Sequence, residues 1–89
     1  MKEPYLEVTF RHGQPFAAYL YLPRQPGEKS CKTSKANPGL IIDFNESGKP
    51  IGIEITAPSK VTVDDINCVM ENLGLSRIRS EELAPLRAA

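Results

Sequence analysis

Residues 39–55 read GLIIDFNESGKPIGIEI, two apolar runs joined by the short polar segment 45–48. That segment begins with Asn and ends with Gly, the composition of a type I turn closed by a residue in the left-handed region. With a four-residue loop, Ile42 faces Ile51 in the expected register. The sequence therefore predicts a β-hairpin at the centre of the fold, with six apolar side chains on one buried face: Leu40, Ile42, Phe44, Ile51, Ile53 and Ile55.

Alternating apolar residues predict two further strands, over 6–10 and 16–22. The proline- and lysine-containing segment 23–38 has little to bury and is expected to be a loop, with a short polar edge strand possible over 29–34.

One convincing helix is predicted over 62–73. The Thr62 hydroxyl can cap its first turn, acidic residues follow, and Gly74 supplies a stop. Apolar residues recur at helical spacing on one stripe, and Cys68 lies opposite that stripe. We therefore expect Cys68 to be exposed, or buried by a partner.

Together these elements predict an α+β fold, a small antiparallel meander of about four strands packed against one helix. A chain of 89 residues supports one domain, which we place over 1–75. Residues 76–89 are expected to form a tail or a short second helix, which would start at Ser80 and be shortened by Pro85.

Composition excludes several classes of function. Eleven basic and eleven acidic side chains cancel, so nucleic-acid binding is disfavoured. The exception would be a weak basic cluster in the loop, made of Arg24, Lys29, Lys32 and Lys35. Two cysteines and one histidine are too few for a zinc site, so we expect no metal and no cofactor. The absence of a long apolar run predicts no membrane insertion, and the chain is expected to be cytoplasmic with reduced thiols.

The hairpin carries two acidic residues on its polar face, Asp43 and Glu54. In the expected register Asp43 lies across from Pro50, so the two carboxyls are about 13 Å apart. Paired carboxylates of hydrolases lie about 5 to 9.5 Å apart, so this register predicts no catalytic dyad. Glu54 is expected either to face water or to accept hydrogen bonds from backbone amides or from Ser59.

Other chemistry in the sequence is sparse. Gly52, inside a strand, indicates a bulge or a close approach of another backbone. His12 lies in a predicted turn with no orienting residue, which argues against a pairing with a cysteine nucleophile. Tyr19 and Tyr21, with Cys68, are the candidate interface residues, because tyrosine is enriched in protein interfaces.

The motifs AYLYL at 18–22, the hairpin 39–55 and APSK at 57–60 resemble a family of small bacterial proteins, the domain-of-unknown-function family 2283. Eight residues match its pattern: Gly39, Asp43, Gly48, Gly52, Ile53, Glu54, Ile55 and Ser59. Family members commonly carry an acid where this chain has Phe16. The resemblance implies no assigned activity. Some members look like partners of small toxin-like proteins, which makes an antitoxin-like or accessory role a hypothesis.

From these observations we predict a non-enzymatic protein that acts by association, either as a homodimer or with a small protein partner. The alternative is a small-ligand binder or enzyme that uses Glu54, Asp43 and Ser59.

Overall fold

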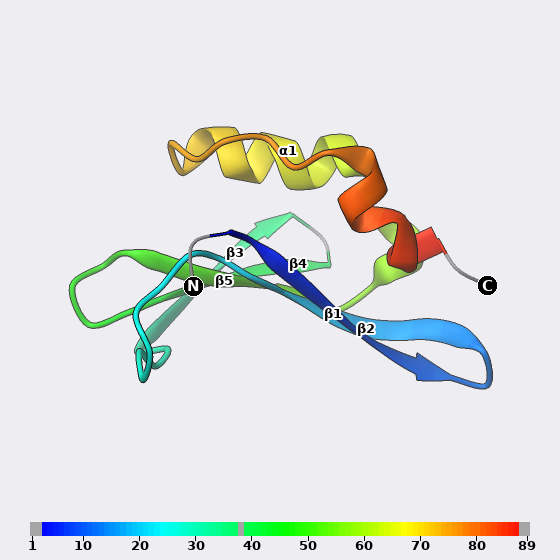
Figure 1. Ribbon diagram of the computed structural model, residues 1–89, viewed down its shortest axis with the longest axis horizontal. Coiled ribbons are helices and arrows are strands. Elements are labelled where there is room, and N and C mark those ends of the chain that lie inside the picture. The colour runs from blue at the N-terminus through cyan, green and yellow to red at the C-terminus, as the bar shows by residue number, and fades with distance from the viewer. Residues whose placement is uncertain (1–2, 38, 88–89) are drawn as a thin grey trace.

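The computed structural model describes residues 3–37 and 39–87, in which five antiparallel strands form one sheet (Figure 1). The strands are β1 (Tyr5–Arg11), β2 (Gln14–Tyr21), β3 (Lys32–Asn37), β4 (Leu40–Phe44) and β5 (Pro50–Ile55). The predicted α+β class is confirmed, with five strands in place of about four. The additional strand, β3, lies at an edge of the sheet within the segment expected to be a loop, and it overlaps the possible edge strand over 29–34 at residues 32–34.

The strand order is β1-β2-β5-β4-β3, which differs from a simple meander. In a simple meander of the four expected strands, β4 would lie beside β2. Here the chain crosses from β2 to the far edge, forms β3, and returns through β4 to β5, so β5 pairs with β2. The exposed lysines of β3 suit an edge, where they discourage pairing with other chains.

The predicted register of the central hairpin is wrong by two residues. Ile42 pairs with Ile53, not with Ile51, and Asp43 pairs with Gly52. One residue of the shift comes from a loop over 45–49, and the other from a β-bulge between Asp43 and Phe44. Because side chains alternate with a period of two, a shift of two leaves every side chain on its predicted face.

The predicted turn is confirmed within this longer loop. The Gly48 N–H donates to the Asn45 carbonyl at 3.0 Å, and Gly48 has a φ of +87°. The face assignment is also confirmed, since Leu40 and the four isoleucines predicted for that face are buried and Phe44 packs partly against the core.

Helix α1 (Val63–Asn72) lies where the sequence predicted it. A capping box stabilises its N-terminus: the Asp65 N–H donates to the Thr62 hydroxyl, and the Thr62 N–H donates to the Asp65 carboxylate. Cys68 is exposed, which was one of the two predicted outcomes. Two 3₁₀ helices flank α1, η1 (Pro58–Lys60) and η2 (Ser80–Arg87). The second starts at the predicted Ser80, but it continues through Pro85 to Arg87, so the expected shortening at Pro85 is wrong. No described helix is both long enough and apolar enough to span a membrane.

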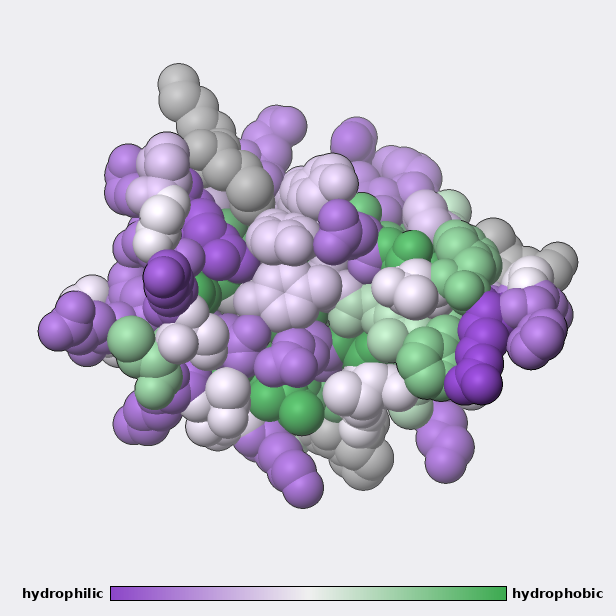
Figure 2. Space-filling model, turned by 90° about the horizontal axis from the view of Figure 1, so that it is seen from below, coloured by the Kyte–Doolittle hydropathy of each residue, from purple (hydrophilic) through white to green (hydrophobic). Residues whose placement is uncertain are grey.

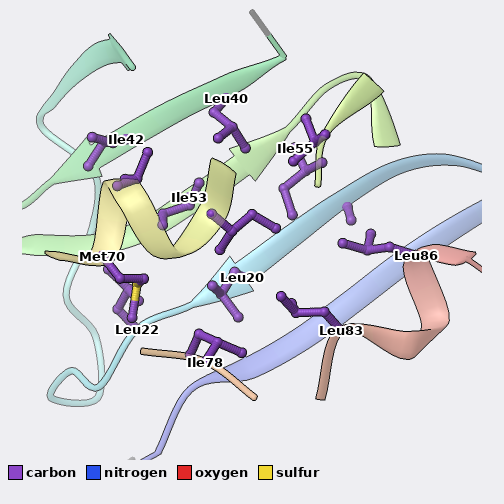
Figure 3. Close-up of a cluster of buried hydrophobic side chains, with 14 residues drawn as sticks. Leu20, Leu22, Leu40, Ile42, Ile53, Ile55, Met70, Ile78, Leu83 and Leu86 are labelled. Atoms are coloured by element: carbon purple, nitrogen blue, oxygen red, sulfur yellow. The ribbon is translucent and has the colours of Figure 1, made fainter. Parts of the chain in front are cut away.

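Helix α1 runs over one face of the sheet, and η2 descends beside β1 and β2 (Figure 1). Side chains from both segments meet those of the sheet in one core, where Met70, Ile78, Leu83 and Leu86 lie around Leu20 and Leu22 (Figure 3). The core therefore takes up one face of the sheet and leaves the other for a site.

Candidate functional site

The sheet face opposite α1, which we call the open face, is covered by no helix of the described chain. Figure 2 views the molecule from this side and shows weakly polar side chains over the middle, with strongly hydrophilic ones around the rim. The strand registers and the alternation of side chains define its members: Tyr5, Glu7, Tyr19, Tyr21, Thr33, Lys35, Ile41, Asp43, Gly52 and Glu54.

Three tyrosines of β1 and β2 form a row of contacting rings on the open face. The Tyr21 ring lies between the other two, 5.4 Å from Tyr5 and 4.7 Å from Tyr19 between centroids. Tyr5 is 54% exposed, while Tyr19 and Tyr21 are half-buried. The hydroxyl of Tyr21 also donates to the Glu7 carboxylate at 3.3 Å. The row is thus held in place on its β1 side.

Tyr19 reaches across β5 to Asp43 on β4, because nothing on Gly52 blocks its way. Its hydroxyl donates to Asp43 Oδ2 at 2.7 Å. A Cβ built on Gly52 would collide with the Tyr19 ring and hydroxyl. The group that approaches Gly52 closely is therefore a tyrosine side chain, where the sequence predicted a bulge or another backbone. Burial, and then the hydrogen bond to Asp43, raise the pKa of Tyr19 to about 12, so the phenol stays protonated as a donor.

Asp43 and Glu54 lie within hydrogen-bonding reach of each other, so the predicted separation of about 13 Å is wrong. The cause is the two-residue shift, which pairs Asp43 with Gly52 and makes Glu54 its diagonal neighbour. The hydrogen bond to Asp43, followed by burial and charge repulsion, raises the pKa of Glu54. Asp43 itself is only 5% exposed. The two carboxyls are therefore neighbours on the open face.

Arg24 lies beside this pair, at the start of the loop that follows β2. Its guanidinium donates to the Ile51 carbonyl at 2.6 Å and to the Tyr19 hydroxyl at 3.4 Å. Its Cζ atom is 5.0 Å from the centre of the Tyr21 ring and 5.9 Å from that of Tyr19. A cation over aromatic faces is attracted to them. The sequence had placed Arg24 only in a weak basic cluster.

A shallow hollow of about 400 Å³ opens above these groups. Its lining comes from β2 to β5 and from the loop after β2: Tyr19, Tyr21, Arg24, Ser30, Thr33, Asp43 and Glu54. No group of three or more His, Cys, Asp or Glu side chains in residues 3–37 and 39–87 is arranged to hold a metal ion. The hollow thus brings together two carboxyls, a guanidinium and two phenols.

A comparison with family models finds one match for this segment of the chain. Residues 17–58 match the family described as protein of unknown function (DUF2283). The predicted resemblance is thereby confirmed. No curated protein and no solved structure matches the chain.

The DUF2283 segment contains the whole polar cluster of Tyr19, Asp43, Gly52 and Glu54. Residues of the family pattern that lie far apart along the chain thus meet at one place on the open face. The glycine inside the second strand of the hairpin, Gly52, was the sequence signal for a close approach at this place.

The other predicted site residues lie outside the hollow. Gly48 closes the β4–β5 turn, and Ser59 is exposed on η1 just beyond residue 58, where the DUF2283 match ends. Glu54 contacts Asp43, whereas a hydrogen bond from Ser59 was one of the predicted arrangements. Cys68 lies on α1, which packs on the other face of the sheet.

Proposed function

We propose that this chain acts by protein association and docks a second copy of itself on the open face. The observation that carries the proposal is the row of contacting tyrosines on β1 and β2, on a sheet face that no described helix covers. Tyrosine combines a large apolar ring with a polar tip, and it is enriched at protein interfaces. A sheet face that no described helix covers also offers a surface for association.

The charges of the open face favour a second copy as the partner. Glu7 lies on β1 at one edge of the face, and Lys35 lies on β3 at the other. A two-fold axis between the faces and parallel to the strands places β1 of each copy over β3 of its partner. This arrangement brings Glu7 of each copy close to Lys35 of the other. The net charge of zero adds no overall repulsion.

The size of the molecule is consistent with such an interface. Its extents are 37 × 24 × 23 Å, and the open face spans much of one of its larger sides. Stable complexes bury about 800 Å² on each partner. A face-to-face contact over most of the sheet approaches that area.

Charge exchange across the interface tests the proposal. Glu7→Lys and Lys35→Glu should each weaken self-association about tenfold, because each creates two like-charged contacts. The double variant should recover the wild-type dissociation constant, measured by sedimentation equilibrium. Lys60→Glu, an exposed lysine on η1, is the matched control and should change nothing. A wild-type chain that stays monomeric at high concentration would contradict the proposal.

The proposal includes a cytoplasmic location in a bacterium, which the two free and exposed cysteines support. A small accessory or antitoxin-like protein is the other partner to test, with the same Glu7 and Lys35 variants. The rival function, ligand binding, is favoured by one observation, the contact of Asp43 with Glu54.

A further inference from the structure

Asp43 is a buried carboxyl whose partners are incomplete. Its Oδ2 atom accepts the Tyr19 hydrogen bond, but its Oδ1 atom is buried without a donor. Arg24 is linked to this carboxyl through the Tyr19 hydroxyl, which contacts both side chains. Burying a carboxylate without a cation or a full set of donors is costly. The atom therefore needs either a proton held nearby or a bound cation.

Glu54 is the source of that proton in the empty site. Two ionised carboxylates only accept hydrogen bonds, so the contact between Glu54 and Asp43 becomes a hydrogen bond when Glu54 is protonated. With one proton shared, Asp43 and Arg24 balance each other and the hollow has a formal charge of zero. Loss of the proton leaves one uncompensated negative charge.

We propose that Asp43 and Glu54 form a binding site for an alkylammonium group, which takes the place of the proton that the two carboxyls share. Binding forms ammonium–carboxylate contacts at Glu54 and Asp43 Oδ1, and the proton of Glu54 leaves to solvent. One positive charge enters as another departs, so the hollow keeps its formal charge of zero. No covalent bond changes.

The lining of the hollow favours an ammonium over other cations. An ammonium presents three donors on a compact head, and its remaining donors face the hydroxyl-bearing lining residues Ser30 and Thr33. Thr33 pairs directly with Asp43 in the sheet. A divalent metal would require more oxygen ligands than two carboxyls provide. The aromatic rings of Tyr19 and Tyr21 suit the alkyl chain that follows the ammonium.

Binding is expected to tighten as the pH rises. The groups that face Glu54 are Asp43 from β4, Tyr19 and Tyr21 from β2 and Arg24 from the loop, with Glu7 and Lys35 further out on the same face. The contact with Asp43 raises the pKa of Glu54. Below that pKa the ammonium must displace a proton, and above it the site is already ionised.

The site does not rest on self-association, since all the lining residues come from one chain. Docking of a second copy on the open face would cover the hollow. A small free amine and a lysine side chain of a docked protein both carry the alkylammonium group. Two probes separate these sources. One is n-butylammonium chloride, and the other is lysine whose α-amino and α-carboxyl groups are blocked and whose side-chain ammonium is free.

The experiment is a titration of the full chain with each probe, followed by amide chemical shifts and by proton release in weakly buffered solution. We expect saturable shifts at Tyr19, Asp43 and Glu54, and about one proton released per ammonium below the pKa of Glu54. If the blocked lysine binds more tightly than n-butylammonium, the natural ligand is a protein side chain. If the two probes bind equally, it is a free amine. The same titration on Glu7→Lys tests access if the wild type self-associates.

Two variants and one control decide the outcome. Glu54→Gln and Asp43→Asn should each weaken binding about tenfold or more, and Glu54→Gln should also abolish proton release. Glu46→Gln, which removes an exposed acid of the β4–β5 turn, should bind as the wild type does. Linear shifts without saturation, equal shifts with sodium chloride, or undiminished binding by both variants would overturn the proposal.

Discussion

The Tyr19 side chain crosses over Gly52, and its hydroxyl donates a hydrogen bond to Asp43. A side chain of β2 is thereby joined to one of β4 across β5, the strand between them. Glycine in a strand interior weakens the strand by itself, because it adds backbone entropy and packs no side chain. Here its absent side chain provides the path for the tyrosine. The stability lost at Gly52 is offset by a hydrogen bond that spans three strands.

Gly52→Ala should destabilise the fold by about 1–3 kcal/mol, because the added methyl group displaces the Tyr19 ring and breaks its bond to Asp43. Urea denaturation measures the change. In the background of Tyr19→Ala the same substitution should cost much less, since the colliding ring is gone. Equal costs in the two backgrounds would show that the collision is not the cause.

Tyr19→Phe tests the hydrogen bond alone. The pKa of Tyr19 is raised to about 12, first by burial, whereas that of Tyr21 is raised mainly by Glu7. A phenol whose pKa is higher in the folded state stabilises the fold below its unfolded pKa near 10, and that contribution disappears as the pH rises towards 12. Absorbance at 295 nm should therefore show a last tyrosine ionising near the alkaline unfolding transition.

The Tyr19→Phe variant should lack this last ionisation step, and near neutral pH it should lose about 1–3 kcal/mol of stability because Asp43 Oδ2 is left without its donor. Tyr5→Phe is the control, because it removes the hydroxyl of a tyrosine that is 54% exposed. A late step that persists in Tyr19→Phe would assign it to a different tyrosine.

The faces of the central hairpin could be predicted from its sequence, but its pairing could not. Alternation of apolar residues has a period of two, so it fixes which side of the sheet Ile42 and Ile53 occupy. The same alternation cannot detect a shift of two residues. Here that shift arises because Lys49 belongs to the loop and because a bulge follows Asp43. That shift was enough to convert two distant carboxyls into neighbours.

The polar cluster depends on contacts between strands that are not adjacent in sequence. Tyr19 could be chosen as a candidate interface residue, but its bond to Asp43 follows from β5 lying between β2 and β4. That order in turn depends on β3, whose polar sequence carries little apolar alternation. The helix from 63 to 72, by contrast, is encoded locally by its cap and its apolar stripe, and it was predicted almost to the residue.

Asn67 links α1 to the segment that follows it. The sequence pattern of the helix did not predict this role. Its amide donates to the Ile78 carbonyl at 3.0 Å and its Oδ1 accepts from the Ile78 N–H at 2.6 Å, all in buried surroundings. Asn67→Ala should cost about 2–4 kcal/mol, because both backbone groups of Ile78 lose their partner. Urea denaturation measures this loss.

Hydrogen exchange of residues 76–87 should rise in Asn67→Ala if the side chain holds that segment in place. The exposed Asn72, on the same helix, provides the matched control as Asn72→Ala. A loss of stability without faster exchange in 76–87 would assign the effect to the helix itself.

Glu54→Gln separates the proton of the carboxyl pair from its geometry. The pKa of Glu54 is raised by its hydrogen bond to Asp43, so its contribution to stability is present below the unfolded pKa and is lost as the pH rises through the folded one. A glutamine amide keeps a donor towards Asp43 at every pH. The variant should match the wild type near pH 4 and exceed its Tm by on the order of 2 °C at pH 8, since solvent screens this half-exposed group. Glu46→Gln should show no such divergence between pH 4 and pH 8. A variant that is less stable than the wild type at pH 8 would mean that the ionised Glu54 has a stabilising partner other than the shared proton.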